Sequence, residues 1–228
     1  MLPVGAILVD FDGTACLHDV AEHLLMRFGD PAWADLDAAW LRGDMGNRET
    51  ITAQAAMLEA PIEDLIAYAL DHCRIDPTFP SFVRWARGHD VPVTLVSDGF
   101  GFYIEPILAA AGLGDVPVIT NTWRDRQIVF GNGHGECIGC GTCKMRAVLE
   151  AQAPTDRVAF VGEGASDRYG ALYADVTFAK DALVDHCRRD GVAFVPWVTF
   201  DDVRRHLDSV SELPGPVAPE RCPGWRFP

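Results

Sequence analysis

The 228-residue sequence contains no uninterrupted apolar stretch close to the roughly 18 residues that a membrane-spanning helix needs. Its first residues, Met1 to Val4, also lack the basic start and the following apolar stretch of a secretion signal. We therefore expect a cytoplasmic protein that does not associate with a membrane.

Basic residues are scarce. The chain has 19 Lys and Arg against 33 Asp and Glu, which gives a formal net charge of −14 at pH 7. Nucleic acids and anionic membranes attract surfaces rich in Lys and Arg, so we expect neither as a partner. A small anionic substrate remains compatible with this charge, because a bound divalent cation can make one site locally positive. The sequence gives no expectation about the oligomeric state.

A disulfide framework is also not expected. The seven cysteines are an odd number in a chain without an export signal, and a chain of this length can bury a core without covalent links. Hydrophobic residues make up 49% and charged residues 23%, which is typical of a globular protein.

Short apolar strands alternate with helices along most of the chain. Strands are expected at 6–11, 91–96, 116–120, 157–161 and 176–179, and helices at 82–87, 104–111, 144–152, 167–173, 182–189 and 201–207. Residues 122–131 are expected to form a hairpin or an irregular excursion. This alternation predicts an α/β fold of the Rossmann-like type, a parallel sheet with helices on both faces.

The segment between the first two strands is too long for a simple crossover. Its apolar residues recur at helical spacing, so we expect residues 17–80 to form a helical cap inserted over the sheet. The core domain would then comprise residues 1–16 and 81–213. Five prolines in residues 214–228 predict an irregular tail.

Polar residues follow three of the expected strands, and ligands of open parallel sheets bind beyond the carboxyl ends of strands. These residues are Asp10 and Asp12 after the first strand, Ser97-Asp98-Gly99 after the second and Glu163 with Asp167 after the fourth. Clustered carboxylates repel one another, and oxygen ligands favour Mg²⁺. Each residue alone has a plainer explanation as a helix cap, a turn residue or a solvated acid.

Four motifs in this order resemble those of the haloacid dehalogenase superfamily. They are Ile-Leu-Val-Asp-Phe-Asp-Gly-Thr at 7–14, Thr-Leu-Val-Ser-Asp-Gly-Phe at 94–100, Lys144, and Val-Gly-Glu-Gly-Ala-Ser-Asp at 161–167. The early helical insertion resembles the C1 cap of the phosphoserine phosphatase-like branch. Segments 97–103, 140–144, 178–183 and 200–203 are similar to the 2-hydroxy-3-keto-5-methylthiopentenyl-1-phosphate phosphatases of methionine salvage.

The resemblance implies a phosphatase that works through an aspartyl-phosphate. Asp10 would be the nucleophile and a ligand of Mg²⁺. Asp12 would protonate the leaving group and then activate water, and its backbone carbonyl would bind the metal ion. Lys144 would neutralise Asp10 and the transferred phosphoryl group.

The same resemblance implies the phosphate and metal sites. Ser97 and the backbone N–H groups of Asp98 and Gly99 would hold phosphate oxygens. Glu163 would complete the metal site, with Asp167 as a support or as a ligand through water.

Glu163 departs from the family pattern, in which this motif usually begins Gly-Asp. The additional methylene moves the carboxylate outward by about 1.5 Å. Rate and metal preference are therefore left open, with Mn²⁺ as an alternative to Mg²⁺. An alternative function is a binding or regulatory protein that keeps the fold with weak or no catalysis.

Two cap residues bear on the substrate. Asp19 occupies the position at which phosphoserine phosphatases carry an acid for the substrate's ammonium group. Gln54 occupies the position of their carboxylate-binding arginine, so the bidentate contact is missing. Phosphoserine is thus disfavoured, and we expect another small phosphorylated metabolite, with a ketose or enediol phosphate of methionine salvage as a candidate.

The motif His134-x2-Cys137-x2-Cys140-x2-Cys143 permits three interpretations. The first is a tight loop with free thiols that places Lys144, and the second is a tetrahedral Zn²⁺ site. The third is redox or iron–sulfur chemistry, although a fourth cysteine at a suitable spacing is missing. A metal-sensing or redox-sensing module built on this loop is a further alternative function.

Overall fold

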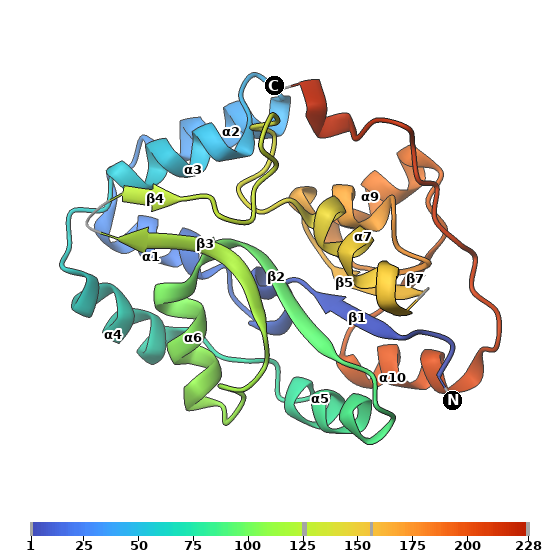
Figure 1. Ribbon diagram of the computed structural model, residues 1–228. Helices are drawn as coiled ribbons and strands as arrows, with labels where there is room; N and C mark the ends of the chain where they lie inside the picture. The colour runs from blue at the N-terminus through green and yellow to red at the C-terminus, as the bar shows by residue number, and fades with distance from the viewer. Residues whose placement is uncertain (1, 125–126, 156, 227–228) are drawn as a thin grey trace.

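The computed structural model describes residues 2–124, 127–155 and 157–226. The strands of this part of the chain form one sheet in the order β4-β3-β2-β1-β5-β6-β7 (Figure 1). Their bounds are β1 Ala6–Val9, β2 Val93–Phe100, β3 Val118–Arg124, β4 Gln127–Val129, β5 Val158–Gly162, β6 Val176–Ala179 and β7 Phe194–Pro196. All neighbouring strands are parallel except β3 and β4, which are antiparallel. The expected α/β, Rossmann-like fold is confirmed.

Helices cover both faces of the sheet. They are α1 (Val20–Phe28), α2 (Trp33–Arg42), α3 (Asn47–Ala56), α4 (Ile62–His72), α5 (Phe79–Gly88), α6 (Gly101–Ala110), α7 (Lys144–Thr155), α8 (Arg168–Ala171), α9 (Asp181–Asp190) and α10 (Phe200–Ser209). Buried residues of α5, α6 and α10 belong to one apolar cluster, and those of α7, α8 and α9 belong to another. The sheet therefore lies between two apolar layers.

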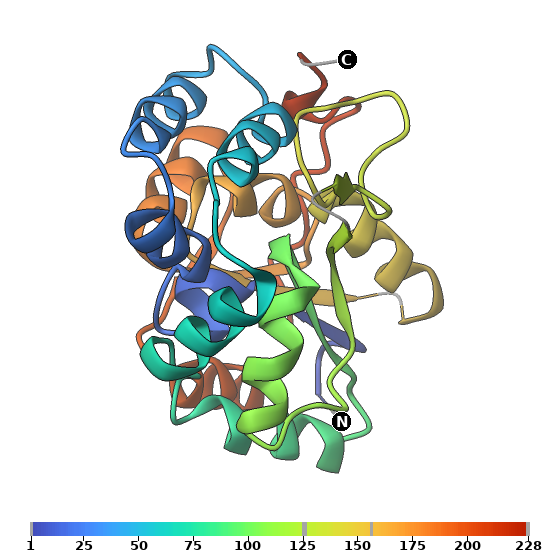
Figure 2. The same ribbon diagram turned by 90° about the vertical axis from the view of Figure 1, so that its left-hand side faces the viewer.

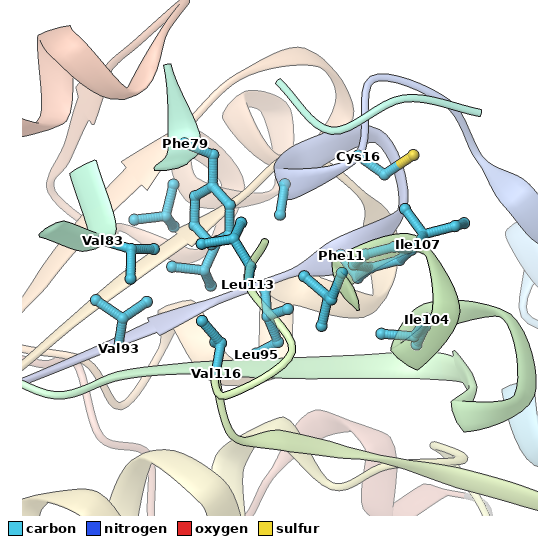
Figure 3. Packing of buried hydrophobic residues seen from close by; sticks show 14 of the residues in the cluster. Phe11, Cys16, Phe79, Val83, Val93, Leu95, Ile104, Ile107, Leu113 and Val116 are labelled. Carbon is cyan, nitrogen blue, oxygen red and sulfur yellow. The ribbon is translucent and has the colours of Figure 1, made fainter. Parts of the chain in front are cut away.

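Strand β1 is apolar throughout because both of its faces are covered. Its residues alternate: Ile7 and Val9 pack into the first cluster, whereas Ala6 and Leu8 pack into the second. Figure 3 shows part of the first cluster, which includes Phe79 and Val83 of α5 together with Val93 and Leu95 of β2.

The two strand ends nearest the predicted site differ from expectation. Strand β1 stops at Val9, and Phe11–Ala15 form an irregular turn in which Asp12 has extended dihedral angles and Gly13 has φ +69°. Strand β2 continues to Phe100, but its register with β3 shifts between Val96 and Phe100. Residues 97–99 therefore form a bulge within β2, whereas the sequence analysis places them after the end of this strand. The turn of the expected 122–131 hairpin includes residues 125–126, which lie outside the described residues.

The switch point of the topology lies at β1, because the strands added on its two sides come from different halves of the chain. Helices α2 and α3 lie beyond the end of the sheet toward which β1 points (Figures 1 and 2). Helices α1 to α4 all fall within residues 17–80, the segment that the sequence assigns to a cap.

After α10 the chain runs along the edge of the molecule to the opposite end (Figure 1). Residues 210–222 have no regular secondary structure, and Pro223–Arg226 form a 3-10 turn. The N–H groups of Gly215 and Ala218 donate to the carbonyls of Asp175 and Leu172, at 3.0 and 2.7 Å, and these bonds tie the segment to the core. Among the described helices, none combines the length and the apolar character needed to cross a bilayer.

Candidate active site

A buried lysine lies at the centre of the predicted site. The Nζ atom of Lys144, the first residue of α7, lies 2.7 Å from Oδ1 of Asp10, 2.6 Å from Oδ1 of Asp167 and 3.1 Å from Oγ of Ser166. Burial alone would lower the pKa of Lys144, but the nearby carboxylates outweigh burial and raise it. The ammonium group therefore stays charged where β1, α7 and the turn after β5 meet.

Asp10 comes directly after β1 and is 5% exposed. Burial and the charge of Asp167 raise its pKa to about 8, against the opposing effect of Lys144. Its Oδ1 atom contacts Lys144, whereas no described residue forms a hydrogen bond to Oδ2. One oxygen is thus anchored and the other is available for chemistry.

Asp12 lies in the irregular turn after β1. Its Oδ1 accepts the backbone N–H of Val20 at 2.9 Å, and the hydroxyls of Ser97 and Tyr103 both lie 3.3 Å from Oδ2. Burial, followed by the charges of Asp19 and Asp10, raises the pKa of Asp12 well above its usual value. A raised pKa favours the protonated form of a carboxyl group, which is the form that a general acid needs.

Tyr103 was not identified from the sequence. It is fully buried in α6, and its hydroxyl occupies the space beside Gly99 where a Cβ atom would lie. A residue with a side chain at position 99 would also lie 2.9 Å from Oδ2 of Asp12. The available signal was its position in the first turn of α6, four residues after Gly99.

Some groups of the predicted phosphate-binding segment, residues 97–99, form hydrogen bonds within the protein. The N–H of Gly99 donates to Oγ of Ser97 at 2.9 Å. The carboxylate of Asp98 accepts the N–H of Thr142 at 2.5 Å and the side-chain amide of Asn47. Asp98 therefore links the tip of β2 to the start of α3 and to the loop before Lys144.

The acids after β5 differ from each other. Asp167 is fully buried, and its Oδ2 accepts the N–H groups of Glu163 and Gly164 at 2.8 and 2.9 Å. With Oδ1 on Lys144, Asp167 holds the lysine and the turn. The carboxylate of Glu163 instead lies against Gly13, and no described residue forms a hydrogen bond or ion pair with it. Burial and the charge of Asp167 raise the pKa of Glu163 to about 7.

These carboxylates suit a hard cation in their chemistry. Burial and neighbouring carboxylates raise the pKa values of Asp10 and Glu163, so a bound cation would favour their ionised forms. In the described part of the chain, no three His, Cys, Asp or Glu side chains already form a metal-binding set. Mg²⁺ does not need such a set, since it usually takes one or two carboxylates together with water and substrate phosphate. The donor groups of Asp10, Asp12 and Glu163 therefore fit this ion.

Asp10, Asp12 and Glu163 line a cavity of about 310 Å³ that extends to the helices α1 to α3. Asp19 and Gln54 line it, as the sequence predicts for cap residues. Asp19 also caps α1 by accepting the N–H of Glu22 at 2.8 Å, and Gln54 donates to the carbonyl of Trp33 at 3.3 Å. Apolar side chains fill much of the remaining wall, among them Leu24, Leu25, Trp40, Leu41, Ile51, Leu58 and Phe102.

The cysteine loop lies apart from this cavity. Cys137, Cys140, Cys143 and His134 line a second, smaller hollow, to which the tail contributes Cys222. The cysteines described by the structure are all free thiols. Sequence reasoning missed Cys222 because it lies far from the loop along the chain.

Comparison with known families gives a match over most of the chain. The family model described as haloacid dehalogenase-like hydrolase matches residues 7–171.

Two curated proteins similar to the chain carry the same name. A Brevibacillus brevis protein named 2-hydroxy-3-keto-5-methylthiopentenyl-1-phosphate phosphatase is 28% identical over 213 residues, which cover 90% of this chain and 96% of that protein. A Bacillus velezensis protein of the same name is 24% identical, with 91% of each chain covered.

Solved structures share the fold at low sequence identity. A phosphoserine phosphatase structure with a phospho-aspartyl intermediate analogue superposes with a TM-score of 0.68 at 16% identity, over 91% of this chain and 99% of that one. A haloacid dehalogenase family hydrolase from Salmonella enterica gives 0.72 at 16% identity, over 91% of this chain and 72% of that one.

Proposed function

We propose that this chain, which belongs to the haloacid dehalogenase-like hydrolase family and is an enzyme of the phosphatase type, hydrolyses a small phosphomonoester through an aspartyl-phosphate on Asp10. The single observation that carries the mechanism is the arrangement around Asp10. Lys144 holds one of its oxygens, no described residue forms a hydrogen bond to the other, and Asp12, whose pKa is raised, follows two residues later.

In the first step, Oδ2 of Asp10 attacks phosphorus and the bond from phosphorus to the ester oxygen breaks. Asp12 donates its proton to the departing alkoxide. Lys144 stays charged and offsets the negative charge that gathers on the phosphoryl oxygens. The products are an alcohol and the aspartyl-phosphate.

In the second step, Asp12 takes a proton from water, and the water oxygen attacks phosphorus. The bond between phosphorus and Asp10 breaks, which releases inorganic phosphate and restores the carboxylate. The hydroxyls of Ser97 and Tyr103 hold Oδ2 of Asp12 in one place through both steps.

Mg²⁺ is the proposed cofactor, held by the carboxylates of Asp10 and Glu163 and by the backbone carbonyl of Asp12, with Mn²⁺ as a substitute. When bound, the ion would neutralise phosphate charge and orient the ester. Asp167 would support the site without binding the ion directly, because its oxygens already accept hydrogen bonds from Lys144 and from two backbone N–H groups.

We propose residues 17–80 as a cap that selects the substrate. The cavity wall that α1 to α3 contribute is largely apolar and carries Gln54 instead of an arginine. This wall suits a phosphate ester whose remaining part is uncharged, and it disfavours phosphoserine. A ketose or enediol phosphate with a methylthio group fits these features, in line with the names of the relatives.

Phosphate release in the presence of Mg²⁺ tests the proposal. We expect turnover of p-nitrophenyl phosphate, and faster turnover of a methylthio-ketose or enediol phosphate within a panel of phosphorylated metabolites. Asp10→Asn is the matched control. A wild-type protein that releases no phosphate from any ester would favour a non-catalytic binding protein instead.

A further inference from the structure

Four cysteines from two distant segments meet at one end of the molecule. Cys137, Cys140 and Cys143 belong to the loop between β4 and α7, and Cys222 belongs to the C-terminal tail. Both views of the fold place this loop beside the short turn at Pro223–Arg226 (Figures 1 and 2). The fourth thiol that the loop spacing lacks is therefore supplied by the tail.

The contacts between loop and tail are close. The Sγ atom of Cys137 donates to the carbonyl of Gly224 at 3.2 Å, and the ring of His134 meets that of Trp225 edge-on with centroids 4.6 Å apart. The four cysteines and His134 line one hollow of about 10 Å³. A hollow of this volume accommodates roughly one water-sized particle. A single ion matches that size, whereas an iron–sulfur cluster of several atoms is too large.

Backbone N–H groups point at three of the four sulfur atoms. Gly139 donates to Cys137 at 3.3 Å, and the backbone N–H groups of Arg146 and Gly224 each lower the pKa of one further thiol, Cys143 and Cys222 respectively, against the larger effect of burial. Such bonds stabilise sulfur that carries negative charge, as a thiolate does when it binds a metal ion.

We propose that Cys137, Cys140, Cys143 and Cys222 bind one Zn²⁺ ion that fastens the C-terminal tail to the loop preceding Lys144. Four thiolates form a closed tetrahedral set of the kind found in structural zinc sites. The described side chains do not yet stand in a metal-binding arrangement, so binding includes rotation of the cysteines about χ1 toward the hollow. His134 is left out of the set, because its Nδ1 accepts the N–H of Glu136 and its ring packs on Trp225.

The test is elemental analysis of the full-length protein, purified without chelators from cells supplied with zinc. We expect about one zinc per chain in the wild type. Cys222→Ser and Cys140→Ser should each lower zinc to background, whereas His134→Ala and Cys187→Ser should keep it. Cys187 is a suitable control because it is buried in α9, away from this hollow.

Two further readouts keep the result independent of folding and of catalysis. Cobalt added to the zinc-free protein should give thiolate-to-metal absorption in the wild type and in His134→Ala, but not in Cys222→Ser. Circular dichroism should show that Cys222→Ser keeps its secondary structure, because the tail lies outside the sheet and helices. None of these measurements depends on phosphate release, so failure of the proposed phosphatase reaction would leave the metal result readable.

Several outcomes would overturn the proposal. A wild-type protein that takes up no zinc, even when zinc is added to the reduced chain, contradicts it. Zinc retained in Cys222→Ser, or lost in His134→Ala but kept in Cys140→Ser, refutes the four-thiolate set. Iron with sulfide, or a disulfide between loop and tail in the protein as isolated, would assign the cluster to redox chemistry instead.

Discussion

At the residue scale, one carboxylate carries the proposed chemistry. Asp10→Asn keeps the size of the side chain but removes the nucleophilic oxygen, so activity should fall at least about a thousand-fold. The thermal midpoint should change little, because burial already disfavours the charge that the substitution removes. Steady-state kinetics and a melting curve measure the two quantities. Activity above a few per cent of the wild type would assign the nucleophile elsewhere.

The neighbouring carboxyl should show the signature of a proton donor. Asp12→Asn should slow turnover of an alkyl phosphate by about 10²–10⁴-fold, the usual weight of general acid–base catalysis. An aryl phosphate with a good leaving group needs little protonation, so its phosphorylation step should suffer less. Rapid-mixing measurements of that step with both esters compare the losses. Equal losses would contradict the role of Asp12 as the acid.

At the element scale, the corner between β2 and α6 is set by the absence of a side chain at Gly99. A Cβ atom there would overlap the Tyr103 hydroxyl and press on Asp12. Gly99→Ala should therefore lower the free energy of unfolding by about 1–3 kcal/mol, the usual cost of overpacking, and reduce activity. Adding Tyr103→Phe removes the overlapped oxygen and should recover part of the loss.

Denaturant unfolding of the single variants and of the double variant measures this coupling. The reference is Tyr103→Phe alone, which reports the value of the hydroxyl in the native corner. If the two substitutions add without recovery, the corner relaxes by another route.

The sequence predicted these elements better than their ends. Strand β1 was foreseen because both of its faces are apolar, and Lys144 was foreseen at the start of its helix. The bulge at 97–99 was not, because it depends on how β2 pairs with β3 across the sheet. The link from Asp98 to Asn47 and Thr142 was missed for the same reason, since it joins three segments that only the fold brings together.

At the scale of the whole molecule, long-range placement was the least predictable feature. Strand alternation and motif order indicated a sheet with acids gathered beyond the carboxyl ends of its strands, and the structure places Asp10 and Asp167 on one lysine there. No local pattern indicated that Cys222 would return to the cysteine loop. That contact depends on the path of an irregular tail, for which neither periodicity nor turn chemistry gives a direction.

The ionisation of the carboxyl groups in the site should make the free energy of unfolding of the protein depend on pH. The pKa of Glu163 is raised from 4.5 to about 7, so between these values the folded state holds a proton that the unfolded chain releases. This group's contribution is therefore fully present below about pH 4.5 and is lost as the pH rises through about 7. Asp10 acts in the same direction.

Glu163→Gln cannot ionise, so without divalent cations it should lose less stability than the wild type between pH 5 and pH 8. The difference should be about 1–2 kcal/mol, because partial exposure screens the charge. Denaturant unfolding in EDTA at both pH values measures it, and Glu150→Gln on the exposed side of α7 is the control. At pH 8, added Mg²⁺ should stabilise the wild type by mass action and the variant much less. An identical pH dependence and an identical Mg²⁺ response in the two proteins would show that Glu163 does not have a raised pKa and does not bind the ion.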